Sequence, residues 1–296
     1  MNTATKQVKD IVTKEIKYIS KLYPYSIKKF FNPELIYSHN ILAFIDYNSA
    51  SFSNSYFYSK TFHHKFIYLM AGIELLAVGV NLHSFNINDL MDLADNKKFT
   101  QKGEKYYTLD LLFGDIFYSR AAIYLLEYGD YLIFNSILDS LKLAHKSKLM
   151  LHQNIVETVN TNLYKDLAKN LASEIPKSKL KNYEMQIEEL FEENLSLILG
   201  INSLIKTSFI IGWGLFSARE DPEIHYRLIN NFVLLKAYND LGSFFKLLPD
   251  SFYGIKQIKF IKDKKSFIKS ELNDIIATLK PEWLKSNFKA LEKLYL

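Results

Sequence analysis

The sequence contains no cysteine, and it has only 10 glycines and 6 prolines among its 296 residues. Without cysteine the chain can form no disulfide, no thiolate nucleophile and no cysteine-ligated metal site. The scarcity of glycine and proline leaves few turn signals, which argues against a fold of many short strands and favours long helices. The phosphate-binding pattern G-x-x-x-x-G-K-[ST], the dinucleotide pattern G-x-G-x-x-G and the zinc pattern H-E-x-x-H are also absent.

We also expect neither an apolar leader nor an uninterrupted membrane span. The N-terminus is charged and has no apolar signal core, so we expect no export. The most apolar stretch, residues 195–218, carries Asn202 and Lys206 near its middle. A lysine at the centre of a membrane helix costs about 2.5–3.5 kcal/mol. We therefore expect this stretch to be a core helix of a soluble, cytoplasmic protein without a transmembrane segment.

The net charge is +5, which is modest for a chain of this size. With 48% hydrophobic and 23% charged residues, the composition is that of a globular protein with a sizeable core. No aromatic-interleaved basic motif or zinc-finger pattern is present, so we expect no nucleic-acid partner. The densest lysines have roughly helical spacing and predict a solvated helix face, the alternative being a patch for diphosphate, anionic lipid or nucleic acid. They are Lys256, Lys259, Lys262, Lys264, Lys265 and Lys269.

Apolar residues recur at helical spacing along most of the chain. No stretch alternates long enough to predict a strand, and we find neither an internal repeat nor a linker. We therefore expect a single all-α domain over residues 1–296, with ten or more helices around a central buried helix. The predicted helices cover residues 3–31, a short segment from Pro33, Phe62–His83, Thr108–Glu127 (ended by Gly129), Asp130–Lys146, 145–171, 183–217, Glu223–Phe245, 257–267, 270–279 and 281–295.

Several polar and glycine residues recur in a fixed order along residues 70–245. Their order resembles that in the trans-polyprenyl diphosphate synthases, whereas residues 1–60 diverge from that family. The resemblance implies an isoprenoid-synthase-like helical bundle. The residues that carry it are Glu74 and His83 in IELLAVGVNLH, Gly114 and Asp115 in LDLLFGDIFYSRAAIYL, Gln153, the pair Lys206 and Thr207, and Asn239 and Asp240 in YNDLGSF.

The metal-binding positions of that family are altered in this sequence. In the family, two aspartate clusters on facing helices bind magnesium ions that hold diphosphate, because hard cations prefer oxygen ligands. Here Ser84 and Phe85 stand in place of the first aspartate pair. The second cluster keeps Asp240, but Asn239 and Ser243 replace its neighbours. No Gly-Gly-Lys-Arg segment precedes the first helix.

The resemblance therefore points to the non-catalytic small subunits of two-component synthases, such as heptaprenyl diphosphate synthase component I. It implies a heterodimer with a catalytic polyprenyl synthase subunit that makes a long isoprenoid, such as a quinone side chain. We expect no catalytic residue, metal or cofactor in this chain, and an isoprenoid tail is a second candidate ligand. Contacts with diphosphate or within a polar interior are expected at Lys206, Thr207, Asp240, Asn239, Gln153 and Asp115.

Two other functions remain open. One is an autonomous magnesium-dependent prenyltransferase or class I terpene synthase that uses Asp89, Asp92 and Asp240. The other is a helical lipid- or protein-binding protein that has lost the synthase chemistry. The histidines predict structural roles: His145 and His152 could share a helix face, but no carboxylate accompanies them.

Overall fold

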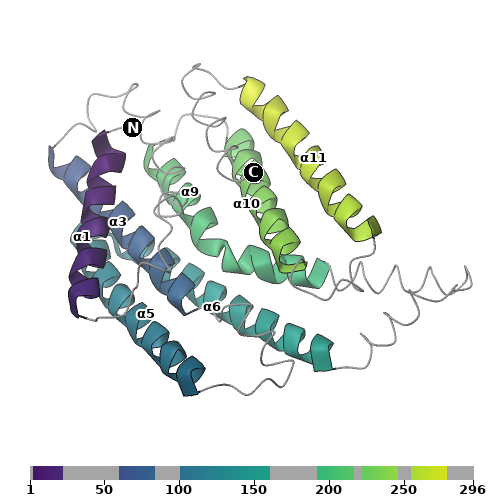
Figure 1. Cartoon of the computed structure of the whole chain (residues 1–296). Coiled ribbons are helices and arrows are strands. Elements are labelled where there is room, and N and C mark those ends of the chain that lie inside the picture. The colour runs from purple at the N-terminus through teal and green to yellow at the C-terminus, as the bar shows by residue number, and fades with distance from the viewer. Residues whose placement is uncertain are drawn as a thin grey trace, which may run out of the picture.

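The computed structural model describes residues 3–22, 60–83, 101–160, 192–216, 222–245 and 255–278. Every secondary-structure element within these ranges is a helix (Figure 1), which confirms the all-α prediction. The described part contains eight helices, and the predicted total of ten or more is not reached there. The segments 23–59, 84–100, 161–191 and 279–296 lie outside the described residues, and with them Ser84, Phe85, Asp89 and Asp92.

Seven of the helices run between the following bounds: α1 Thr3–Leu22, α3 Lys60–Leu82, α5 Gln101–Tyr128, α6 Tyr131–Asn160, α9 Ser203–Phe216, α10 Pro222–Phe245 and α11 Ile255–Thr278. An eighth helix, Glu192–Ile201, directly precedes α9. The helices predicted at Phe62–His83 and Glu223–Phe245 are confirmed within two residues at each end. Pro222 occupies the start of α10, where its missing N–H costs no hydrogen bond.

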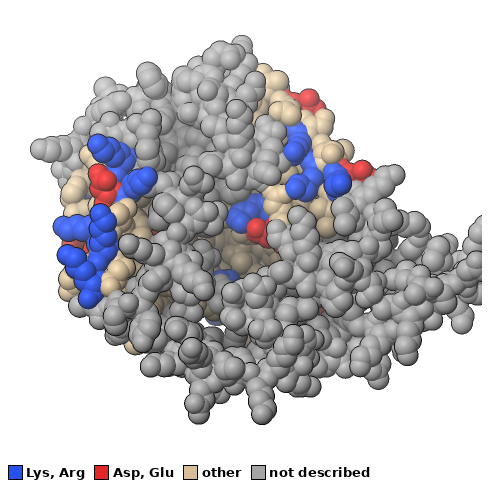
Figure 2. Space-filling view, viewed as in Figure 1, with Lys and Arg blue, Asp and Glu red and all other residues tan. Residues whose placement is uncertain are grey.

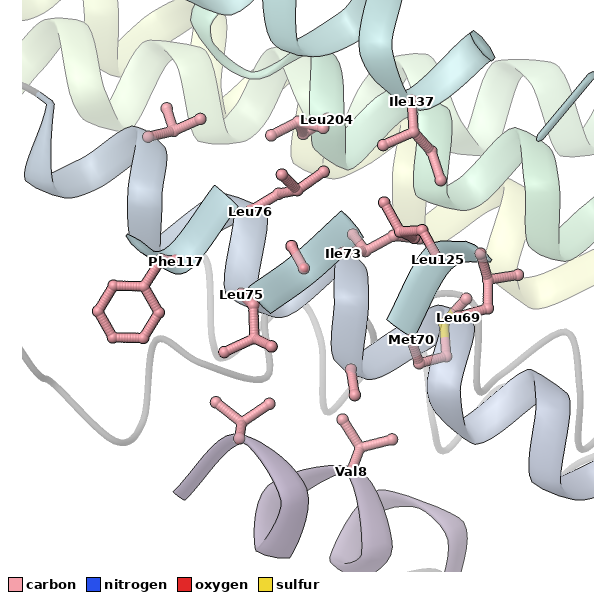
Figure 3. Close-up of a cluster of buried hydrophobic side chains, with 14 of the residues drawn as sticks. Val8, Leu69, Met70, Ile73, Leu75, Leu76, Phe117, Leu125, Ile137 and Leu204 are labelled. Carbon is pink, nitrogen blue, oxygen red and sulfur yellow. The ribbon is translucent and has the colours of Figure 1, made fainter. Parts of the chain in front are cut away.

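The central buried helix of the described part is α3. The sequence pattern predicts residues 183–217 for this position. Helix α3 packs between α1 and α5 and also contacts α6 and α9 (Figure 1). From Phe66 onward its described side chains are buried or half-buried on all sides, as expected for an apolar helix inside a bundle, whereas His64 and Lys65 in its first turns are exposed. In Figure 3, Val8 of α1 points to α3 from one side, while Leu76 of α3 is directed towards Leu204 of α9 on the other.

Helix α6 links this group of helices to a second one, in which α9 contacts α10 and α10 contacts α11. Its buried residues repeat at steps of three and four, which places them along one face. Small residues bring α6 close to α9 and to the helix Glu192–Ile201. The Ser203 hydroxyl of α9 donates to the Ser140 carbonyl of α6 (2.7 Å), and Ser147 of α6 packs on Gly200. The buried row consists of Ile137, Ser140, Ala144, Ser147 and Leu151.

The turn between α5 and α6 consists of Gly129 and Asp130. Gly129 has φ of 82°, the left-handed conformation that suits the residue after a helix, and this confirms the predicted cap. Asp130 then caps α6, because its Oδ1 accepts from the backbone N–H groups of Leu132 (2.9 Å) and Ile133 (3.1 Å). Helix α5 therefore ends, and α6 begins, within three residues.

Four predicted boundaries are wrong. The break near His145 and the break between 267 and 270 do not occur, because α6 and α11 contain no glycine or proline to interrupt them. Conversely, the predicted helix 183–217 bends by 52° at Asn202, between Glu192–Ile201 and the start of α9. The Asn202 side chain accounts for the bend, since its Nδ2 donates to the Ile198 carbonyl (3.1 Å). Helix α5 also begins earlier than the predicted Thr108.

None of the helices in the described ranges is by itself long and apolar enough to cross a bilayer. The bent pair Glu192–Ile201 and Ser203–Gly212 meets the length and composition criteria when its two halves are taken together. Most of its apolar side chains are buried against the other helices.

Candidate functional site

The C-terminal end of α3 is the point after which the family resemblance places the first metal motif. The last carbonyls of a helix lack partners within it and carry partial negative charge. Here the Lys148 ammonium, which comes from α6, donates to the carbonyl of Val80, and the His83 N–H donates to the carbonyl of Gly79 (2.9 Å). An ammonium group of this chain therefore caps the end of α3.

Four further side chains gather beside Lys148, and we call the five together the α3 junction: His83, Asp115, Tyr118, His145 and Lys148. His83 Nε2 lies 3.0 Å from the Leu111 carbonyl oxygen and 3.3 Å from Asp115 Oδ1. The Tyr118 hydroxyl lies 2.6 Å from His145 Nε2. The His83 ring centroid is 4.9 Å from that of Tyr118 and 5.4 Å from that of His145. The junction thus joins α3, α5 and α6.

Burial controls protonation in the α3 junction. It lowers the pKa of Lys148 to about 7. It also lowers the pKa of His145 to about 4, assisted by the charges of Lys148 and His83. The pKa of Tyr118 is raised, first by burial and then by the Asp115 carboxylate. At neutral pH His145 is neutral, and in the tautomer with its proton on Nδ1 its Nε2 accepts a hydrogen bond from the Tyr118 hydroxyl.

Two glycines allow the aromatic rings of the α3 junction to lie directly on helix backbone. A Cβ atom on Gly114 would overlap the His83 ring, and one on Gly79 would overlap the Tyr118 ring. Gly79 and Gly114 also face each other, because a Cβ on the former would lie 3.1 Å from the carbonyl oxygen of the latter. The Gly-Asp pair of α5 therefore has a definite structural role: Gly114 makes room for His83, and Asp115 contacts it.

Asp240 on α10, which only the autonomous-enzyme alternative would use to bind magnesium, is bonded to neighbouring side chains. The Lys236 ammonium donates to both of its carboxylate oxygens (3.0 and 2.9 Å), and the Asn202 amide donates to Oδ2 (3.0 Å). Lys236 precedes Asp240 by one helical turn, and such pairs face each other. Asn202 stands at the bend before α9, so this cluster ties α9 to α10.

The other residues predicted for the site do not join either of these two clusters. Lys206 is half-buried on α9, with its Nζ 5.7 Å from the Tyr226 ring centroid. The Thr207 hydroxyl lies 2.5 Å from that of Ser140, across the contact between α9 and α6. Gln153 is exposed on α6, and Asn239 is half-buried on α10. The structure therefore brings together His83 with Asp115 and Asp240 with Asn202, but it does not assemble one site from all the predicted residues.

The sequence pattern did not single out Tyr118, Lys148 or Lys236. Lys236 could have been found from its spacing to Asp240, and Lys148 from lying three residues after His145 on the same helix face.

As a set, the α3 junction offers an ammonium, a phenol, two imidazoles and one carboxylate. It supplies mainly hydrogen-bond donors, whereas Mg²⁺ prefers oxygen ligands. In the part of the chain that the structure describes, no three His, Asp or Glu side chains converge enough to hold a metal ion.

A pH measurement tests the protonation of His145. Because its pKa is lower in the folded chain than in the unfolded chain, protons favour unfolding. We expect the free energy of unfolding to fall as the pH drops from about 6.5 towards about 4, and the His145→Gln variant to lose less over this interval. Urea denaturation of both proteins at about pH 7 and pH 5 measures this. Lys148, whose pKa is about 7, also takes up protons over this interval, but it does so in both proteins. An equal loss in both proteins would therefore contradict the assignment to His145.

A seam of apolar side chains runs along the outer face of α5. Leu112, Ile116, Ser119, Ile123 and Leu126 follow each other at steps of four, three, four and three, the spacing of a coiled-coil seam. Leu112, Ile123 and Leu126 are 44%, 48% and 64% exposed. The opposite face of the helix is buried against α3. We call this row the α5 seam, and its spacing suits packing against another helix.

Comparison of the chain with protein-family models, with curated proteins and with solved structures gave no match.

Proposed function

We propose that this chain is the non-catalytic partner subunit of a heteromeric trans-polyprenyl diphosphate synthase. The order of its polar and glycine residues along residues 70–245 supports the family assignment. One observation carries the non-catalytic role: both oxygens of Asp240, the remaining aspartate of the second motif, accept hydrogen bonds from Lys236. The carboxylate that would bind magnesium is neutralised by a cation of this chain.

The end of α3 supports the same conclusion from the other motif. Catalysis of prenyl transfer requires several magnesium ions between the aspartate clusters and the diphosphate. Lys148 instead holds an ammonium group at the end of the helix that leads to the first motif, and Ser84 and Phe85 follow in the sequence. The pKa of Lys148 is about 7, so its amine is charged in about half of the molecules at neutral pH, and when charged it repels a divalent cation at short range.

The partner in this proposal is a catalytic synthase subunit, and the α5 seam is the surface that contacts it. An exposed apolar row on a helix of a monomer is typical of a protein interface. Burying three such side chains on association gains free energy without any new charge pair. The complex would act in the cytoplasm, and its product would be a long-chain isoprenoid diphosphate.

Charged substitutions in the seam test the partner role. We expect the wild-type chain to bind a catalytic polyprenyl synthase subunit and to raise its long-chain product from labelled isopentenyl diphosphate. The Ile123→Lys/Leu126→Lys variant should lose about tenfold or more in affinity, because each buried apolar side chain contributes about 1.5–3 kcal/mol. The matched control is Phe267→Lys on α11, which also replaces an exposed apolar residue (63% exposed).

Two results would contradict the proposal. One is an unchanged affinity and product length in the seam variant. The other is magnesium-dependent prenyl transfer by this chain alone that is lost in Asp240→Ala, which would establish the autonomous enzyme instead. Failure of the wild-type chain to bind any catalytic subunit would favour the helical binding protein without synthase chemistry.

A further inference from the structure

The outer face of α1 is a row of lysines. Helix α1 buries Val8, Val12 and Ile19 against α3, and its opposite side is exposed. Of the two acidic residues on the helix, Glu15 is turned inward and bound to Arg120, so Asp10 is the acidic residue of the exposed face. The exposed lysines of the row are Lys6, Lys14, Lys17 and Lys21.

An aromatic side chain accompanies these lysines. Tyr18 is 58% exposed and lies on the same side of α1, one residue after Lys17 and one helical turn after Lys14. Within the described ranges none of the four lysines forms a side-chain salt bridge, although the charge of Lys14 acts favourably on Glu15. Tyrosine together with lysine is the usual composition of a surface at a membrane interface, where the ring lies at headgroup level and the ammonium contacts phosphate.

A second group of lysines lies on the same face of the molecule. In Figure 2 the lysines of α1 gather at the left of the face, and those of α11 appear at its right. Lys262 and Lys264 of α11 are exposed and Lys269 is half-buried, but Asp263 and Asp274 of the same helix are exposed beside them. The lysine row of α1, with one acidic residue, is therefore the main basic surface of this face, and the lysines of α11 add to it less.

We propose that this face binds the surface of an anionic lipid bilayer, with α1 lying against the headgroups. Each lysine near such a surface contributes an attraction that changes affinity about fivefold. A nucleic acid fits the observations less well, because α1 has no arginine, the residue that binds phosphates and base edges with two parallel hydrogen bonds. The proposal does not depend on the synthase-subunit function, since it concerns only the charge on α1 and α11.

Sedimentation with lipid vesicles tests the proposal. The full chain is mixed with vesicles of phosphatidylcholine alone or of equal parts phosphatidylcholine and phosphatidylglycerol. We expect binding to the anionic vesicles only, and a decrease with added salt. The Lys14→Gln/Lys17→Gln variant should bind about 20- to 30-fold more weakly, and Asp10→Asn about fivefold more tightly.

The matched control removes the same charge elsewhere. Lys142 and Lys146 are exposed on α6, so Lys142→Gln/Lys146→Gln should bind anionic vesicles within about twofold of the wild type. The proposal is overturned if the α1 variant binds like the wild type, or if the α6 variant loses as much. It is also overturned if the wild-type chain does not sediment with anionic vesicles, or if a short DNA duplex binds the α1 lysines more tightly than the vesicles do.

Discussion

Replacing Arg120 with alanine is expected to lower the free energy of unfolding by about 3 kcal/mol, because it leaves a buried carboxylate without its cation. The carboxylate belongs to Glu15 on α1, whose side chain is only 6% exposed. Arg120 on α5 binds it with two N–H groups, of which Nε lies 2.7 Å from Oε2. The Tyr124 hydroxyl adds a third hydrogen bond, to Oε1 (2.6 Å).

The size of this effect follows from the burial of one partner. Arg120 is 36% exposed, so its own charge can be solvated when the pair is broken, and this favours the lower end of the range of about 3–5 kcal/mol.

Urea denaturation of the wild type and of Arg120→Ala measures the difference. The double variant Glu15→Leu/Arg120→Met is the control, and it should recover most of the loss because it removes both charges. A loss below about 1 kcal/mol in Arg120→Ala would mean that Glu15 reaches water when its partner is absent.

The pH dependence of the same pair provides an independent measurement. Burial by itself would raise the pKa of Glu15, but the hydrogen bonds from Arg120 and Tyr124 outweigh it and hold the pKa below its ordinary value. The pair therefore stabilises the fold above the pKa of the unfolded chain, and the stabilisation is lost as the pH falls through the folded-state pKa. In Arg120→Ala the guanidinium no longer opposes the effect of burial, so the pKa of Glu15 should rise and the carboxyl should be protonated more readily in the folded chain. The difference in the free energy of unfolding between variant and wild type should therefore become smaller from pH 7 to pH 4.

Much of the fold could be predicted because its signals are local. The helix at Phe62–His83 follows from a run of apolar residues, the start of α10 from Pro222, and the end of α5 from Gly129. The bend at Asn202 was not predicted, because it depends on one side chain that bonds both to its own helix and to Asp240 on α10. A polar residue inside an apolar run has the same appearance in the sequence whether or not it breaks the helix.

The resemblance singled out His83 and Asp115 separately, but their contact was not predicted. They come from two distant stretches of the sequence, and the structure places His83 Nε2 3.3 Å from Asp115 Oδ1. Lys148 was missed because its partner, the carbonyl of Val80, is 68 residues away and carries no signature in the sequence. Which lysine meets which helix end depends on how α3 and α6 pack, and the spacing within either helix does not encode it.

Gly114→Ala is the substitution expected to disturb the α3 junction most directly. Alanine is favoured over glycine within a helix by about 1 kcal/mol, so this change would stabilise an isolated α5. In the folded chain the added methyl group would overlap the His83 ring, which must then leave its contacts with Leu111 and Asp115. Overpacking of this kind costs about 1–3 kcal/mol, and we expect this cost to exceed the gain from helix propensity. We therefore expect a net loss of stability in spite of the better helix former, measured by urea denaturation.

A double-mutant cycle distinguishes the steric cause from a general weakening of α5. His83→Ala removes the ring, so Gly114→Ala made in that background should be neutral or stabilising, which gives a coupling of more than about 1 kcal/mol between the two positions. Ser119→Ala, on the exposed face of the same helix, is the control and should change stability by less than about 0.5 kcal/mol. If Gly114→Ala is as stable as the wild type in both backgrounds, the His83 ring turns aside freely. The contact of His83 with Asp115 would then be a consequence of helix packing, and the α3 junction would not need its glycine.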